Sequence, residues 1–192
     1  MEIKVIEETV KALKDYGRVS IAFRVETRFR VDEIDNGLGG FRLVEERVHP
    51  PYVKDYDCDK GEGPTRWRNQ WNIDHWGVLS AFYGNHRVGG AVVAYDTKNV
   101  FMLEGRKDLA ALWDIRVHPD FRGKGIGAKL FQRAVDWAKS RNCRDFKVET
   151  QNINVPACRF YAKRGCKLGA INRYAYPNHI NEVQLIWCMS IG

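Results

Sequence analysis

Residues 112–127 of the chain read LWDIRVHPDFRGKGIG and combine a strand pattern, a turn and the start of a helix. The apolar residues at the beginning predict a buried strand, and His118-Pro119-Asp120 predicts a turn. Gly123, Gly125 and Gly127 then precede an amphipathic helix pattern. Glycine lets the backbone come close to a ligand, and the first N–H groups of a helix have no partner within it. We therefore expect this loop to bind a phosphate or diphosphate.

The spacing of these glycines excludes two common phosphate-binding loops. The string G-x-x-x-x-G-K-[ST] does not occur in the chain, and glycines at spacings of two and two fail the G-x-G-x-x-G pattern. The loop does match R-x-x-G-x-G, with Arg122, Gly125 and Gly127 at the defined positions. Arg122 and Lys124 add positive charge to that of the helix dipole. This signature resembles the acetyl-CoA pyrophosphate loop of the GCN5-related N-acetyltransferase (GNAT) family.

A second stretch, VETQNINVPACRFYAKRGCKLG (residues 148–169), strengthens the resemblance. Asn154, Tyr161 and Gly165 follow the loop in the order and at the distances typical of GNAT enzymes. Cys166 stands where an aromatic residue is common, away from the chemistry. Over a longer span, strings such as TQNINVPACRFY and LWDIRVHP are similar to the streptothricin (nourseothricin) acetyltransferase branch.

The predicted elements give an α/β fold. Residues 1–111 predict these elements: a strand at Ile3 and Val5, a helix 7–16, strands 19–31 and 41–48 with a stop at His49-Pro50-Pro51, a short helix 64–71 and a hairpin of strands 77–83 and 88–95. The rest predicts strand 112–117, a helix from about 124 to 141, strand 146–150, helix 154–163 and closing strands 166–171 and 183–189. The resemblance implies a GNAT fold, with a mixed central sheet whose two parallel strands splay apart and are flanked by helices. No repeat or linker is visible, so we expect one domain, residues 1–192.

The resemblance also implies acetyl-CoA as co-substrate and a set of binding residues. The first parallel strand would pair with the pantetheine arm, the loop amides would hold the pyrophosphate, and the second motif would contact pantetheine and sulfur. The residues so implied are Ile115, Val117, Arg122, Gly123, Lys124, Gly125, Ile126, Gly127, Ala128, Asn154 and Tyr161.

The reaction needs an unprotonated amine to attack the thioester and a proton for the leaving thiolate. By resemblance Tyr161 is the general acid, since a phenol with a pKa near 10 can protonate a thiolate. Glu149 is the first candidate for the base, Asp114 the second and Glu104 the third, each acting through water. Neighbouring strand residues face opposite ways, so a structural role for Glu149 is an open alternative. Positioning of the amine could also supply much of the rate without a base.

Bulk properties are those of a globular protein: 192 residues, 44% hydrophobic, 29% charged and a net charge of +7. The basic residues are dispersed, which does not favour nucleic acid. Five cysteines, without a C-x-x-C pair, predict reduced thiols and no metal. Asp55-x-Asp57-x-Asp59 lacks the later glycine and glutamate of a calcium loop. No signal-peptide or membrane-span pattern is present, so we expect a cytoplasmic protein and no membrane partner.

The leading interpretation is an acetyl-CoA-dependent N-acetyltransferase for a primary amine of a small cationic acceptor, plausibly a streptothricin-type antibiotic. One alternative is a protein lysine or N-terminal acetyltransferase. Another is a non-catalytic module that binds CoA or nucleic acid. The acceptor side could include the acidic loop 55–62 with Trp67, Trp71, Tyr174 and Tyr176. The sequence leaves the oligomeric state open, a homodimer included.

Overall fold

The structure is a computed structural model that describes residues 2–59, 63–179 and 181–192. Its contacts divide the chain into two compact units. Unit 1 contains Met1–Ala22, Asp55–Val148 and Cys188–Gly192, and unit 2 contains Phe23–Lys54 and Glu149–Trp187. A single domain over the whole chain stays a prediction.

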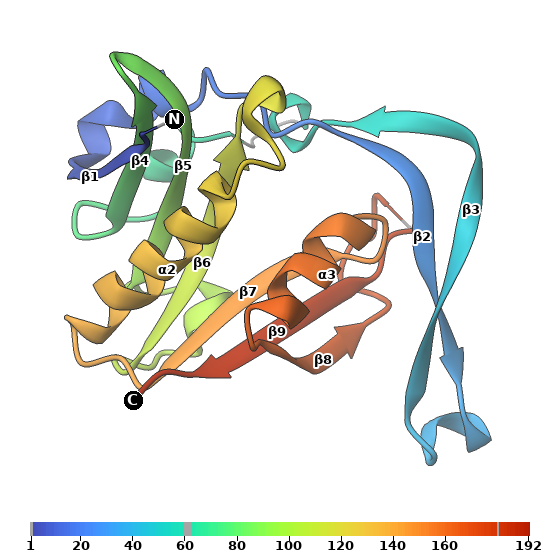
Figure 1. Cartoon of the computed structure of the whole chain (residues 1–192). Helices are drawn as coiled ribbons and strands as arrows, with labels where there is room; N and C mark the ends of the chain where they lie inside the picture. The colour runs from blue at the N-terminus through green and yellow to red at the C-terminus, as the bar shows by residue number, and fades with distance from the viewer. Residues whose placement is uncertain (1, 60–62, 180) are drawn as a thin grey trace. The chain divides into compact units, whose positions relative to one another are not determined.

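Unit 1 is built on a sheet with one long helix (Figure 1). Its strands lie in the order β1-β4-β5-β6-β7, antiparallel except for the parallel β6–β7 pair. The bounds are β1 Lys4–Glu8, β4 Gly77–Tyr83, β5 His86–Tyr95, β6 Leu109–Val117 and β7 Asp145–Gln151, the last of which continues into unit 2. Helix α2, Ile126–Lys139, packs on β4, β5 and β6.

The sequence pattern of α2 explains this packing. Ile126, Leu130, Ala134 and Ala138 recur at helical spacing, and each is at most 2% exposed. Burying a leucine or isoleucine side chain contributes about 2 kcal/mol, so this stripe is enough to hold the helix on the sheet. The predicted helix is therefore confirmed, with its first helical residue at Ile126.

The parallel β6–β7 pairing is short. It runs from Leu109↔Asp145 to Leu112↔Val148, whereas β6 continues to Val117. On its other edge β6 stays paired with β5 as far as Val117. Within the described residues, the remaining part of β6 thus has a strand partner on one edge alone, which leaves main-chain groups available to a ligand.

Unit 2 combines a two-stranded β2–β3 sheet with the remaining strands and a helix. Strand β9 lies between β7 and β8 in sheet order, and α3 contacts β2 and β8. The bounds are β2 Phe23–Glu33, β3 Phe41–Lys54, α3 Val155–Lys163, β8 Lys167–Asn172 and β9 Gln184–Ser190. The buried side chain of Asn152 joins these parts, because it donates to Phe29 O at 2.8 Å and accepts from Val183 N at 2.8 Å.

Three local predictions were wrong. Strand β3 does not stop at His49-Pro50-Pro51 but continues to Lys54. Its pairing with β2 is interrupted there, between the Val25↔Tyr52 and Thr27↔Arg47 pairs, so prolines without an N–H are tolerated. The helix predicted over 7–16 does not form as one element. Residues up to Glu8 belong to β1, which pairs with β4, and the helical segments that follow are short.

The third wrong prediction is the helix over 64–71, where the structure has a 3₁₀ turn at Trp67–Asn69 instead. The short helical segments are η1 Val10–Ala12, α1 Leu13–Tyr16, η2 Asp35–Gly37, η3 Tyr56–Cys58, η4 Trp67–Asn69, η5 Phe101–Leu103 and η6 Pro119–Phe121. In the described ranges, none of the helices has the length and apolar character needed to cross a membrane.

Candidate functional site

The glycine loop between β6 and α2 presents a row of main-chain N–H groups. Gly123 and Gly125 adopt φ values of 76° and 81°, and a Cβ built on either would meet no atom within 4 Å. The helix ladder begins with Lys129 N, which donates to Gly125 O at 3.1 Å. From Gly123 to Ala128, no carbonyl in the described part of the chain accepts from the main-chain N–H groups. Such a row at a helix N-terminus is suited to bind an anion.

The two cationic side chains of the loop donate hydrogen bonds to main-chain oxygens. Arg122 Nε donates to Val117 O at 3.0 Å and its Nη2 donates to Ala22 O at 2.8 Å. Lys124 Nζ donates to Asp120 O at 2.8 Å. Partial burial lowers the pKa of Arg122 without neutralising it. Both residues therefore fix the loop conformation while adding positive charge beside the free amides.

A buried charged cluster underlies β6. Arg116, whose side chain is 0% exposed, donates through Nε to Asp114 Oδ1 at 2.9 Å and through Nη1 to Asp57 Oδ2 at 2.6 Å. The Tyr16 hydroxyl also donates to Asp114. A Cβ on Gly90 would lie 2.4 Å from the Tyr16 ring, so this position must be glycine.

Electrostatics in this cluster keep Arg116 and Tyr16 protonated. Burial tends to lower the pKa of Arg116, but the Asp114 carboxylate outweighs burial and the pKa rises. Burial and the same carboxylate raise the pKa of Tyr16 well above its usual value. Asp114 is thus engaged on both oxygens by partners that stay protonated, which favours a structural role over that of a base.

The acidic loop 55–62 is also partly committed to structure. Asp57 pairs with Arg116, and Asp55 accepts from Asp57 N at 3.1 Å. Glu62 lies outside the described residues. No group of three or more metal-ligating side chains occurs among the described residues.

Tryptophans of unit 1 form a packed aromatic cluster. Trp67 and Trp76 are 5% and 4% exposed. Trp113 on β6 lies 5.0 Å from Trp71 and 5.2 Å from Trp76 between ring centroids. Trp67 is therefore a core residue, which argues against the acceptor-side role that we expected for it.

The second motif lies in unit 2, on and before α3. Asn154 is the N-cap of this helix and its side chain accepts from Ala157 N at 3.2 Å. Its Nδ2 donors have no partner among the described residues, so they can serve a ligand carbonyl. Tyr161 is 4% exposed, and its ring packs edge-on against Phe160 at 5.2 Å.

Glu149 belongs to a polar cluster that the sequence did not predict. Its Oε1 accepts from the Tyr176 hydroxyl, and its Oε2 accepts from Gln184 Nε2 at 2.8 Å. Gln151 Nε2 in turn donates to the Tyr176 oxygen at 2.9 Å. Glu104, the third candidate base, lies in unit 1 and pairs with Lys147. The alternation of side chains along β7 places Glu149 and Gln151 on one face of the strand. Tyr176 and Gln184 come from distant segments, so no local sequence pattern predicts that they contact Glu149.

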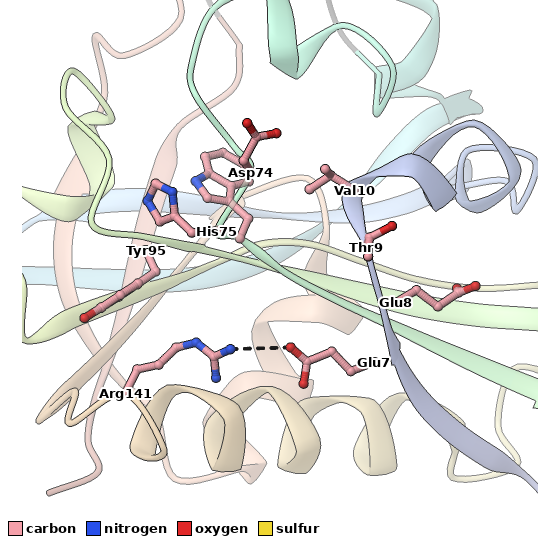
Figure 2. Close-up of a pocket in the computed structure, with 9 residues that line it drawn as sticks. Glu7, Glu8, Thr9, Val10, Asp74, His75, Tyr95 and Arg141 are labelled. Atoms are coloured by element: carbon pink, nitrogen blue, oxygen red, sulfur yellow. Dashed lines mark hydrogen bonds and ion pairs between the residues drawn. The ribbon is translucent and has the colours of Figure 1, made fainter.

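A pocket lies at the other end of α2 from the glycine loop. Figure 2 shows Glu7 and Arg141 paired on its wall, beside His75 and Tyr95. The 14 residues of α2 separate the pocket from the loop by about 20 Å at 1.5 Å per residue. This pocket is therefore distinct from the glycine loop.

Comparison with known proteins agrees with the loop geometry. The profile of the Acetyltransferase (GNAT) family matches residues 42–166. Streptothricin acetyltransferase of Escherichia coli is 33% identical, over 97% of this chain and 94% of that protein. Streptothricin acetyltransferase A of Bacillus subtilis (strain 168) is 28% identical, over 91% and 92%.

A solved structure extends the comparison. A Bacillus anthracis protein assigned as a streptothricin acetyltransferase, in complex with acetyl coenzyme A, has a TM-score of 0.75 and 26% identity, and 99% of each chain is covered. With the family profile covering well over half of its residues and a full-length relative at 33% identity, the chain belongs to the GNAT acetyltransferase family.

Proposed function

We propose that this GNAT N-acetyltransferase uses acetyl-CoA to acetylate a primary amine of a small cationic acceptor, with a streptothricin-type antibiotic as the leading candidate. The observation that carries the proposal is the row of N–H groups from Gly123 to Ala128, which no described carbonyl accepts from. The diphosphate of acetyl-CoA supplies oxygens for such a row. The streptothricin acetyltransferases of Escherichia coli and Bacillus subtilis align with more than nine-tenths of the chain, which supports the choice of acceptor.

Each unit, taken by itself, has donors that suit a part of acetyl-CoA. The loop amides and the charges of Arg122 and Lys124 would hold the diphosphate. Near Ile115 and Val117, one edge of β6 has no strand partner among the described residues, and this edge would pair with the amides of the pantetheine arm. Asn154 would donate its Nδ2 hydrogens to a pantetheine carbonyl.

The chemistry is nucleophilic displacement at the thioester carbonyl. The acceptor ammonium first transfers a proton to Glu149, directly or through water, which gives the neutral amine. The amine nitrogen then bonds to the carbonyl carbon, the C–S bond breaks, and Tyr161 protonates the departing thiolate. The amine's remaining extra proton passes through water and restores the Tyr161 hydroxyl, and Glu149 releases the proton that it first accepted to water. The products are the acetamide and CoA thiol.

Thiol release tests the reaction and the acceptor class together. The protein would be assayed with acetyl-CoA against streptothricin, aminoglycosides, polyamines and lysine peptides, with a thiol reagent as readout. Release with streptothricin and not with peptides is the expected result. Release with peptides alone would select the protein acetyltransferase alternative, and no release with any amine would refute the proposal.

A matched pair of glycine variants tests the loop. Gly125→Ala would place a methyl group where the diphosphate is expected, while Gly105→Ala has the same left-handed backbone, φ 70°, in another loop. Neither Cβ meets an atom within 4 Å, so both variants bear a similar backbone cost of about 1–2 kcal/mol. We expect Gly125→Ala alone to raise the KM for acetyl-CoA, about tenfold or more. Equal KM values in both variants would argue against diphosphate binding at the loop.

A further inference from the structure

The polar cluster around Glu149 is unusual within unit 2 because it contains no cation. Most other acids of the unit pair with an arginine or lysine, for example Glu33 with Arg173, Glu45 with Arg159, Glu46 with Arg28 and Glu182 with Lys54. For Glu149, no lysine or arginine of the described chain lies within ion-pair distance. Its two oxygens instead accept from Tyr176 and Gln184.

The direction of each hydrogen bond in this cluster is fixed. An ionised carboxylate can only accept, so the Tyr176 hydroxyl donates to it and accepts from Gln151. Burial and the neighbouring Glu149 carboxylate raise the pKa of Tyr176, so the phenol keeps its proton. Tyr176 is thus a permanent donor to Glu149.

Neutral donors orient a carboxylate without neutralising it. Glu149 Oε2 accepts from Gln184 alone among the described residues, and a carboxylate oxygen has two lone-pair directions. The side chain is half-buried, so its charge is not fully screened by water. The Glu149 carboxylate therefore has room for one more donor, and a cationic donor from outside the chain would balance its charge.

The surrounding charged groups do not supply that cation. Glu182, in the segment before β9, adds negative charge near Tyr176. It is itself paired with Lys54 at 3.1 Å and lies 3.8 Å from His179 Nδ1. Lys54 is therefore engaged at Glu182, His179 lies beside the same carboxylate, and neither pairs with Glu149.

We infer that Tyr176 and Gln184 are positioning residues which hold Glu149 as the receptor for the protonated amine of the acceptor. This inference rests on the proposed N-acetyltransferase function, and it identifies the Glu149 carboxylate as the group that selects a primary ammonium ion. Tyr176 and Gln184 act through Glu149 and do not themselves exchange protons with the acceptor.

Steady-state kinetics with matched tyrosine variants test this inference. Tyr176→Phe removes the donor to Glu149, while Tyr83→Phe removes the hydroxyl of a tyrosine on β4 that is 45% exposed. A hydrogen bond to a charged group corresponds to about tenfold or more in binding. We expect Tyr176→Phe to raise the KM for the amine by about that factor and to leave the KM for acetyl-CoA unchanged. In Tyr83→Phe we expect both KM values to stay unchanged.

The pH profile separates positioning from a merely structural role. Because Glu149 receives the amine's proton in the proposed reaction, removal of the donor to its carboxylate should move the acidic limb of kcat/KM for the amine to higher pH in Tyr176→Phe. Gln184→Met, which removes the donor to Oε2 at similar volume, should give the same shift and serves if the tyrosine variant does not fold. The inference would be overturned if both the KM for the amine and the acidic limb stayed unchanged in these variants. An equal rise in the KM for the amine and the KM for acetyl-CoA would also overturn it. A wild-type enzyme without thiol release would instead refute the proposed function.

Discussion

The buried Asp114–Arg116 pair gives the sharpest prediction about stability. In Asp114→Asn the amide presents hydrogens where the carboxylate accepts from both Tyr16 and Arg116. Arg116, with a side chain 0% exposed, cannot turn to water for a new partner. Breaking a buried ion pair costs about 3–5 kcal/mol, and the remaining pair with Asp57 reduces this to about 2–4 kcal/mol.

The measurement is urea unfolding followed by tryptophan fluorescence, since Trp113 lies beside the substituted residue on β6. With an m value of about 2 kcal/mol/M, a loss of 3 kcal/mol moves the midpoint by about 1.5 M. Asp57→Asn is the control: its side chain is 26% exposed and Arg116 keeps Asp114, so we expect a loss of about 1 kcal/mol. A midpoint shift below about 0.3 M for Asp114→Asn, together with a large fall in kcat, would refute the structural role and make Asp114 the base.

Three further predictions concern single side chains. Tyr161→Phe should lower kcat about a hundredfold with little change in KM, because it removes the proton donor to the thiolate; an unchanged kcat would take Tyr161 out of the chemistry. Glu149→Gln should abolish the acidic limb of the kcat/KM profile for the amine, and a retained limb would assign proton removal to water. Burial raises the pKa of Cys158 from 9.0 to about 11, so the folded state holds a proton that the unfolded chain releases. Its contribution to stability is complete below pH 9 and lost as the pH rises to about 11; a loss seen equally in Cys158→Ala by urea titration would exclude this cause.

Periodic and glycine-rich segments could be predicted from the sequence. The stripe from Ile126 to Ala138 specifies α2 because it depends on residues within one element. The glycine loop was predictable for the same reason, since its backbone conformation depends on local residue types. Strand β3 was not predictable beyond Pro50, because the interruption of its pairing is set by the distant strand β2.

The polar clusters show the limit of reasoning from sequence more clearly. Asp114 and Tyr16 are separated by 98 positions, and Glu149 and Gln184 by 35. No local pattern links such pairs, because the folded sheet alone brings them into contact. The sequence could therefore nominate Glu149 and Asp114 as acids but could not assign one to structure and leave the other without a cation.

Titration calorimetry with acetyl-CoA measures binding at the glycine loop separately from catalysis. We expect the wild-type protein and Gly105→Ala to bind acetyl-CoA with equal affinity, and Gly125→Ala to bind it about tenfold or more weakly. A wild-type protein that binds neither acetyl-CoA nor CoA would refute diphosphate binding at the loop, and so would a Gly125→Ala variant that binds as tightly as the wild type.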